Sequence, residues 1–308
     1  RFVMHNKTKL FIVCMIAAVA LLAAAGGWAA MVCTTVGEGA DEATIAVAAN
    51  FTEPLKDLIA ACQSTGNPCS DTKYTVCADA TANLKAAIDS NYSAYGYFFA
   101  ADTTAKVYNT HSGAGTAYEY AKGIPVFFGS HNTSTMPDVS KLITHSPALS
   151  GYATDITTSS LSGYTINTAD SKYIAVAGTA APYGKMSHTI INAMMSTSLP
   201  GTIPTDYVHS PLYDNIGLTF NSVTDGTNKS GWVSKAQICS GLSGSPPNYV
   251  YVGFTHADYT LHQWAIQLNT GTGYEAATAL HDYINTTLAC PSGTGWTNFL
   301  STHCYGAP

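Results

Sequence analysis

Charged residues are scarce in this sequence, and basic residues are the scarcer kind. Asp, Glu, Lys and Arg make up 10% of the 308 residues, against about 25% in an average soluble domain. Thirteen Lys and Arg face 19 Asp and Glu, which gives a formal net charge of −6. Without an excess of positive charge the chain has no basic surface for a phosphate backbone, so we expect no nucleic-acid binding.

The short motifs of metal sites and hydrolases are also missing. No CxxC, HxxxH or HExxH pattern occurs, and the ten histidines are scattered along the chain. We therefore expect no metal-binding residues. Residues 241–245 (GLSGS) resemble a nucleophile elbow, but Ser245 replaces its closing glycine and two prolines follow. We expect no catalytic residues, no enzyme activity and no cofactor.

Apolar residues, in contrast, are plentiful. They make up 46% of the chain, and the mean hydropathy is +0.08. Such a chain is too apolar to be disordered. At roughly 150 residues per domain its length suggests about two domains.

The first apolar run lies near the N-terminus. Lys7 and Lys9 precede residues 10–25, which are all apolar, and the small residues Gly26, Gly27, Ala29 and Ala30 follow. This order is typical of a secretory signal peptide cleaved near 27–30, although a run of roughly 20 residues could also stay uncut as a membrane anchor. We assign residues 1–33 to a signal peptide or N-terminal anchor and expect an exported protein.

Cysteines are frequent in the rest of the chain. Seven lie beyond the apolar run, at Cys33, Cys62, Cys69, Cys77, Cys239, Cys290 and Cys304. Export together with this number of cysteines predicts disulfides. We expect Cys290 to pair with Cys304, and two of the cysteines at 62, 69 and 77 to pair with each other. The odd count leaves one thiol that is free or belongs to the anchor region.

Strand and helix patterns alternate after residue 40. Strands are predicted at 44–49, 74–78, 97–101, 124–129, 173–177, 250–254 and 264–268, and helices at 52–62, 83–88, 182–195 and 274–287. This order predicts an α/β fold of two lobes, each a mostly parallel sheet flanked by helices, with a ligand cleft between the lobes. We place lobe 1 at 41–122 plus 256–308 and lobe 2 at 123–255.

Three turns that lead from a strand into a helix carry small and neutral polar residues. They lie at 48–52, 79–83 and 180–184. Ligands of open α/β sheets collect at the carboxyl ends of strands, where helix N-termini present free N–H groups. Such turns suit an oxyanion held by amides and hydroxyls. Each turn taken alone fits an ordinary helix start equally well.

Several segments resemble, in chain order, motifs of the periplasmic molybdate-binding proteins of ABC transporters. They are ATIAVAANFTEPLKDL at 43–58, FFAADT at 98–103, YAKGIPVFF at 120–128 and IAVAGTAAPYGK at 174–185. Residues 299–306 resemble the closing helix and tail of that family. The resemblance covers about 43–308 and implies a type II periplasmic solute-binding protein. Such a protein closes on a tetrahedral oxyanion, molybdate or tungstate, and delivers it to an ABC permease. We expect a monomer, with membrane attachment possible through the N-terminal segment.

The same resemblance implies a set of ligand-binding residues: Ala49, Asn50, Thr81, Tyr183, Ile216 and Ser234. Thr81 matches a serine of the family, and Ser234 falls where some members place a tyrosine. Ile216 corresponds to a backbone N–H at a helix start. Asp79 departs from the serine-rich stretch of the family. A carboxylate there would weaken anion binding unless it points away or binds a donor.

Other solutes on the same fold remain open. Phosphate carries a proton near neutral pH and needs a buried acceptor, which Asp79 could supply. The tyrosine-rich segment 92–97 could stack on a sugar or another small organic solute. An anchored surface protein without a transport role is the third alternative, and it predicts that Asn50 and Thr81 do not converge on one cleft. The polar stretch 131–170 has no assigned role.

Overall fold

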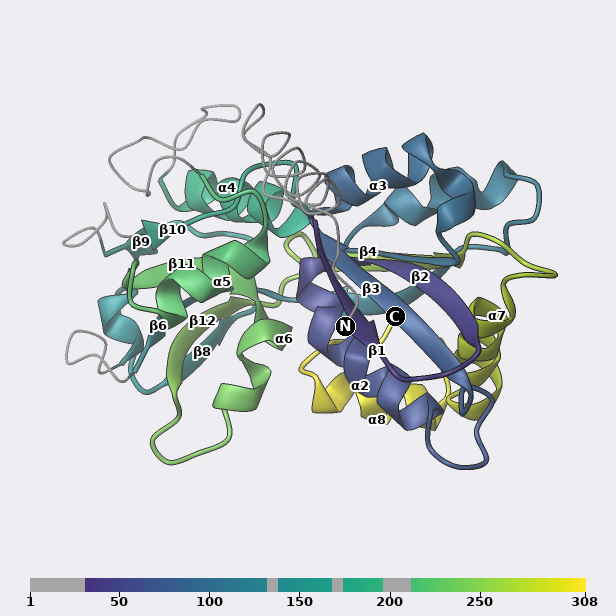
Figure 1. Ribbon diagram of the computed structural model, residues 1–308. Helices are drawn as coiled ribbons and strands as arrows, with labels where there is room; N and C mark the ends of the chain where they lie inside the picture. Colours follow the sequence, from purple (N-terminus) through teal and green to yellow (C-terminus); the bar gives the residue numbers. More distant parts are fainter. Residues whose placement is uncertain (1–30, 132–137, 168–173, 196–211) are drawn as a thin grey trace, which may run out of the picture. The chain divides into compact units, whose positions relative to one another are not determined.

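The computed structural model describes residues 31–131, 138–167, 174–195 and 212–308 (Figure 1). The predicted signal peptide or anchor at 1–33 lies outside the described residues except for its last three. Val32–Pro308 forms one compact unit. Within the described residues, no helix has both the length and the apolar character needed to cross a membrane.

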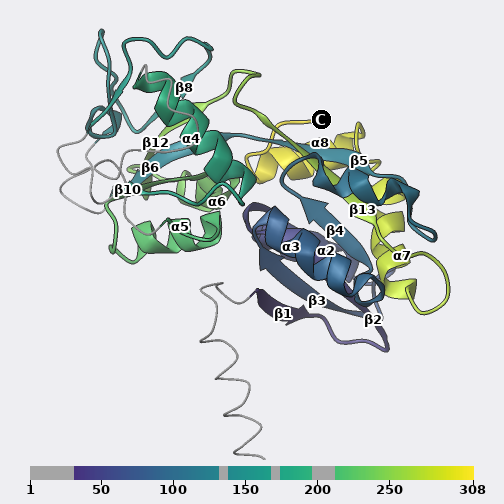
Figure 2. The same ribbon diagram turned by 90° about the horizontal axis from the view of Figure 1, so that it is seen from above.

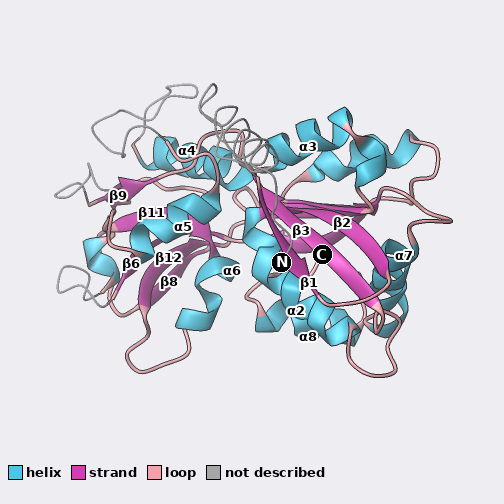
Figure 3. Ribbon diagram, viewed as in Figure 1, coloured by secondary structure: helices cyan, strands magenta, loops and turns pink. Residues whose placement is uncertain are grey.

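Two sheets, each flanked by helices, make up this unit (Figure 3). The first has the strand order β1-β3-β2-β4-β13-β5. Its strands are β1 (Val32–Val36), β2 (Asp41–Ala48), β3 (Thr72–Asp79), β4 (Tyr97–Ala100), β5 (Tyr118–Gly123) and β13 (Leu261–Gln267). Its helices are η1 (Ala49–Phe51), α2 (Thr52–Cys62), α3 (Thr81–Ser90), η2 (Tyr92–Ala94), η3 (Thr103–Thr110), α7 (Glu275–Asp282), the π-turn η7 (Tyr283–Thr287) and α8 (Thr294–Thr302).

The second sheet has the order β10-β11-β6-β12-β8. Its strands are β6 (Pro125–Ser130), β8 (Ala153–Ile156), β10 (Ile174–Ala175), β11 (Ser230–Ser234) and β12 (Tyr249–Phe254). A separate short ladder joins β7 (Ile143–Thr144) to β9 (Thr165–Ile166). The helices here are η4 (Val139–Lys141), α4 (Pro182–Met194), α5 (Ile216–Thr224), α6 (Lys235–Ile238) and η6 (Cys239–Gly241).

Both sheets are mixed, so the prediction of mostly parallel sheets is wrong in that detail. β2 runs parallel to β3 and β4, but β1 and β13 pair antiparallel with their neighbours. In the second sheet β6 is antiparallel to both β11 and β12. The physical reason is the path of the chain. A strand that returns from the other sheet, such as β13, runs against the strand β5 that left.

The chain crosses between the two sheets twice. Only Ile124 separates β5 from β6, and residues 255–260 lead from β12 back to β13. The proposed limits of two lobes stay a prediction, because Val32–Pro308 clusters as one unit.

Each sheet has its own apolar core. α2, α7 and α8 lie against the first sheet (Figure 2). Leu58, Leu280 and Trp296 of these helices are buried in one core with Phe51 of η1. In the second sheet, Trp232 of β11 stacks on the Phe127 ring and lies in a core with residues of α4. These cores hold the helix starts in place, and the helix starts form the site described below.

Most predicted elements are confirmed within a few residues. The exceptions are informative. The strand predicted at 173–177 is only Ile174–Ala175, with Tyr173 outside the described residues, and the helix at 274–287 continues from α7 into a π-turn. No predicted strand corresponds to β1, β5, β7, β8, β9 or β11.

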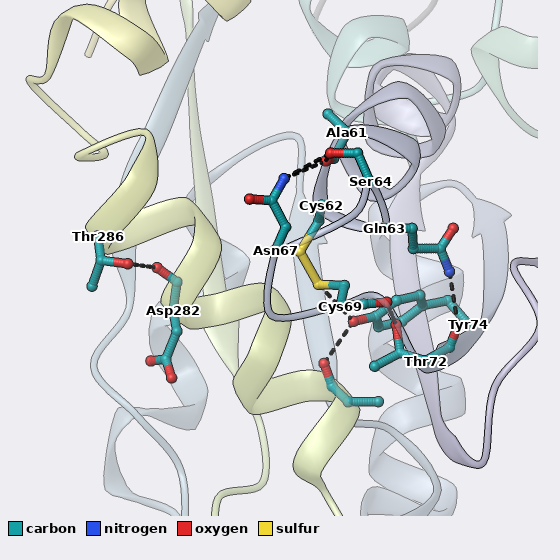
Figure 4. Close-up of a disulfide and its surroundings, with 11 residues drawn as sticks. Ala61, Cys62, Gln63, Ser64, Asn67, Cys69, Thr72, Tyr74, Asp282 and Thr286 are labelled. Carbon is teal, nitrogen blue, oxygen red and sulfur yellow. Dashed lines mark hydrogen bonds between the residues drawn. A yellow bond between two sulfur atoms is a disulfide. The ribbon is translucent and has the colours of Figure 1, made fainter.

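Three disulfides link described residues: Cys33–Cys77, Cys62–Cys69 and Cys239–Cys304. The prediction of a pair within 62, 69 and 77 is therefore confirmed (Figure 4). The predicted Cys290–Cys304 pair is wrong, and Cys290 is a free, half-buried thiol. Cys304 is bonded to Cys239 instead, and the nine-residue helix α8 separates Cys290 from Cys304 along the chain.

Candidate functional site

A small cavity lies where four helical segments begin. Its lining residues come from the starts of η1, α3, α4 and α5: Ala48, Ala49, Asn50, Asp79, Ala80, Thr81, Ala101, Ala181, Pro182, Tyr183, Asn215 and Ile216. The cavity volume among them is about 10 Å³, close to the roughly 10–15 Å³ that a cavity needs to hold one water. Sites for drug-sized molecules have about 300–1,000 Å³. The cavity therefore excludes a drug-sized molecule and has room for little more than one water.

Five of the six predicted ligand residues line this cavity: Ala49, Asn50, Thr81, Tyr183 and Ile216. They come from both sheets, since η1 and α3 follow strands of the first sheet and α4 and α5 pack on the second. Ser234 is fully buried and is not among the lining residues. It hydrogen-bonds to Tyr183 instead. The contribution of each residue to ligand binding stays a prediction.

The helix starts around the cavity leave backbone donors available. The N-cap residues Ala48, Ala80 and Ala181 have no side-chain capping bond within the described structure. The first N–H groups of a helix have no partner inside that helix, and the helix dipole makes this end positive. At α5, the Asn215 side chain accepts only from Leu218 N (3.0 Å), which leaves the Ile216 amide to the cavity. Together these helix starts present N–H donors and the positive ends of helix dipoles toward the cavity.

Thr81 adds a side-chain donor. Its hydroxyl is buried and accepts a hydrogen bond from the Ala101 N–H at 3.1 Å. A hydroxyl has one hydrogen to donate besides its two lone pairs. Because the bond from Ala101 uses a lone pair, the hydrogen of Thr81 remains for a ligand.

The side chain of Asn50 is committed to the protein. Its Nδ2 donates to Gln263 Oε1 (2.9 Å) and to the Tyr305 hydroxyl (2.8 Å). Its Oδ1 is buried and has no hydrogen-bond partner among the described residues. Both amide hydrogens are thus used, so an anion at this turn would be held by backbone N–H groups.

Tyr183 is held by residues from both sheets. Its hydroxyl accepts from Gln263 Nε2 of β13 (2.8 Å) and from the Ser234 hydroxyl at the end of β11 (3.0 Å). Burial raises the pKa of Tyr183, so this hydroxyl stays protonated. With two bonds accepted, its own hydrogen is left to donate.

Asp79 is the charged residue of the lining, and donors from the protein surround it. Its Oδ1 accepts from Ala80 N–H (2.7 Å) and Asn215 Nδ2 (3.1 Å), and its Oδ2 from Asn83 Nδ2 (3.2 Å). The carboxylate is therefore satisfied before any ligand arrives. Its bond to Asn215 also positions the residue that caps α5.

Sequence reasoning did not find Gln263, Tyr120 or Tyr305. Gln263 is separated from Asn50 by 213 positions and from Tyr183 by 80. It lies in the strand sequence LHQWAIQ, where a glutamine gives no local signal of a site. Tyr305 lies in the C-terminal tail whose likeness to the family was noted, and that was the available hint.

No group of three or more His, Cys, Asp or Glu is placed to hold a metal ion among the described residues. The tyrosine-rich segment lies elsewhere. Tyr95 and Tyr97 are buried, and the Tyr92 hydroxyl donates to the Leu268 carbonyl. These rings are thus occupied by contacts within the protein.

Solved structures share this fold at low sequence identity. The periplasmic molybdate-binding protein of Azotobacter vinelandii is 16% identical over 86% of this chain and 99% of its own, with a TM-score of 0.57. The substrate-binding protein of an ABC transporter from Agrobacterium tumefaciens is 12% identical over 91% of this chain and 85% of its own, with a TM-score of 0.58.

The CcmR regulatory domain of Synechocystis PCC6803, solved in complex with 2-PG, is 7% identical over 80% of this chain and 97% of its own, with a TM-score of 0.50. No family model and no curated protein matches the sequence. These likenesses show the fold, which is the α/β fold of periplasmic solute-binding proteins, and the fold alone does not name the ligand.

Proposed function

We propose that this protein is an extracytoplasmic solute-binding protein that captures a tetrahedral oxyanion, molybdate or tungstate, and delivers it to an ABC permease. The observation that carries the proposal is the convergence of four helix starts on one small cavity, with helix-start amides that lack side-chain caps and the residues Thr81 and Tyr183 among its lining. The disulfides fit an oxidising compartment outside the cytoplasm. Attachment through residues 1–33 and a monomeric state stay predictions.

Uncharged donors can hold a dianion in such a place. A hydrogen bond to a charged group contributes about 1.5–3 kcal/mol, and each helix start adds the equivalent of roughly half a positive charge. No Lys or Arg lines the cavity within the described residues. Neutral groups at fixed positions select an anion by its size, and they release it more readily than a full countercharge would.

A protonated anion such as hydrogen phosphate is the second candidate. Asn50 Oδ1 is a buried acceptor without a donor among the described residues, and Asp79 places a carboxylate in the same wall. An anion that carries a hydrogen could donate to such an acceptor. Stacking of a sugar on the rings of segment 92–97 has less support because Tyr95 and Tyr97 are buried, although Ser93, Ala94 and Gly96 line a second pocket of about 330 Å³. The surface-protein alternative has less support because Asn50 and Thr81 line one cavity.

Isothermal titration of the full chain with molybdate, tungstate, sulfate and phosphate tests this proposal. We expect submicromolar binding of molybdate and tungstate and much weaker binding of sulfate. Tight binding of phosphate alone would favour the second candidate. The absence of binding by all four anions would refute both.

A matched pair of variants at Ile216 locates the site. Ile216 is the first residue of α5, where proline fits a helix but removes the N–H. Ile216→Pro should weaken molybdate binding by about 10- to 150-fold, the equivalent of one bond to a charged group. Ile216→Ala loses the same side chain but keeps the N–H, so it should bind nearly as the parent does. Equal affinities of the two variants would remove this amide from the site.

A further inference from the structure

We propose that Gln263 is a positioning residue of the oxyanion site, which fixes the spacing between the Asn50 turn and the Tyr183 turn. The inference rests on the proposed function and deepens it, because it names a residue that sets which size of anion the cavity accepts. Gln263 does not line the cavity. It acts through the two residues that do.

The carboxamide of Gln263 contacts both turns at once. Its Nε2 donates to the Tyr183 hydroxyl at 2.8 Å, and its Oε1 accepts from Asn50 Nδ2 at 2.9 Å. A second bond to Oε1, from the Tyr120 hydroxyl at 2.7 Å, fixes the orientation of the group. Gln263 is fully buried, so water cannot replace these bonds without rearrangement. One rigid planar group therefore sets the distance between two walls of the cavity.

These bonds lie beside the places where the chain crosses between the sheets. Gln263 is the third residue of β13, just after the crossing at 255–260, and it pairs in register with Ala121 of β5. Gly123, the last residue of β5, precedes the other crossing at Ile124. A methyl group on Gly123 would overlap the Tyr183 hydroxyl and the Gln263 amide. The glycine thus leaves the room that this contact requires.

The position explains why the contact bears on selectivity. The Asn50 turn belongs to the first sheet and α4 packs on the second, so any relative movement of the two sheets changes the span between them. A bond that joins the turns next to both crossings limits this change. Without it the cavity would adapt to anions of different sizes, and the preference for molybdate over the smaller sulfate would fall.

Three variants of the full chain test the proposal by titration. Gln263→Met keeps the bulk and removes the bonds, and Gly123→Ala crowds both the Tyr183 hydroxyl and the Gln263 amide while Gln263 itself stays a glutamine. Gln267→Met is the matched control, since Gln267 is buried on the same strand but bonds to Asn269 and Thr278. The first two variants should lower molybdate affinity about tenfold, as expected for two buried bonds. They should also reduce the ratio of molybdate to sulfate affinity, which a general loss of stability would not change.

The control should lower the melting temperature by a similar amount but leave both affinities unchanged. An unchanged affinity ratio in Gln263→Met, or an equal reduction of this ratio in Gln267→Met, would overturn the proposal.

Hydrogen exchange without ligand separates this inference from the proposed function. Gln263→Met should speed amide exchange in both turns, 49–52 and 181–187, whereas Gln267→Met should not. If the parent chain binds none of the anions, the proposed function is refuted. Amide exchange alone then tests the positioning role of Gln263. Faster exchange in both turns then supports the positioning role, and unchanged exchange in either turn refutes it.

Discussion

The hydroxyl of Thr81 illustrates how a single residue gains a role from its neighbour. A threonine at a helix start often caps its own helix, but here the bond from Ala101 N–H fixes the hydroxyl as a donor. The Asp79 carboxylate and the Asn50 amide nitrogen, by contrast, bond to partners inside the protein, whereas Asn50 Oδ1 has no partner among the described residues. Residues that line the same cavity thus differ in what they can offer to a ligand.

Removal of this hydroxyl should weaken anion binding. In Thr81→Val the shape is kept, the donor is lost and the Ala101 N–H has no partner, so we expect a loss of about 1–3 kcal/mol in molybdate affinity. Thr81→Ser keeps the hydroxyl and should bind within a few-fold of the parent. Titration calorimetry on both variants measures the difference. Equal affinity of the valine and serine variants would mean that Thr81 does not contact the ligand.

At the scale of residues, the sequence predicts those site residues that lie in a short local pattern. Thr81, Tyr183 and Asn50 lie in short turns between a strand and a helix, and such turns have a recognisable pattern. The residues that hydrogen-bond to these turns have no such local pattern. Gln263, Tyr305 and Tyr120 come from strands and a tail that are distant in sequence. The resemblance implies that Ser234 binds the ligand, but Ser234 does not line the cavity, and its hydroxyl donates a hydrogen bond to the Tyr183 hydroxyl.

At the scale of elements, the edge strand β1 shows the limits of pattern reading. Val32–Val36 directly follows the apolar N-terminal run, and two of its residues lie inside the segment predicted as a leader or anchor. Pairing with β3 and the bond from Cys33 to Cys77 make it part of the first sheet. The sequence pattern does not indicate strand direction either, because composition and periodicity are the same for parallel and antiparallel strands. A cleavage at 27–30 would leave β1 intact.

The three disulfides should differ in their effect on stability. A disulfide restricts the unfolded chain more when it closes a longer loop. The loops here have sequence separations of 7, 44 and 65 residues for Cys62–Cys69, Cys33–Cys77 and Cys239–Cys304. Replacing each pair by two serines should therefore cost about 2, 4 and 4 kcal/mol in turn. Urea unfolding of the three variants measures these values, and a larger loss for Cys62–Cys69 than for the others would contradict the order.

At the scale of the whole molecule, charge opposes the proposed ligand. The chain carries a net charge of −6 and few basic residues. A dianion that approaches is therefore repelled, although the local donors attract it once it reaches the cavity. Selectivity and affinity must come from short-range bonds.

Salt should consequently speed the capture of molybdate. Raising the ionic strength from about 10 mM to 150 mM shortens the screening length from about 30 Å to about 8 Å. We expect the association rate to rise about twofold or more as the repulsion is screened. Stopped-flow fluorescence with sodium chloride as the salt measures the rate. A rate that falls with salt would indicate a positively charged entrance and would contradict the prediction.

The disulfide between Cys239 and Cys304 has a consequence for proteolysis. Cys239 comes directly after α6, which follows β11 of the second sheet. Cys304 comes shortly after α8, which packs on the first sheet. A protease that cuts within 255–260 would produce two fragments that remain one covalent molecule until a reducing agent is added. A cut beside Ile124 would not, because Cys33–Cys77 and Cys62–Cys69 lie before it and Cys239–Cys304 after it. Both crossings join the two sheets, but only a cut within 255–260 leaves the two fragments covalently joined.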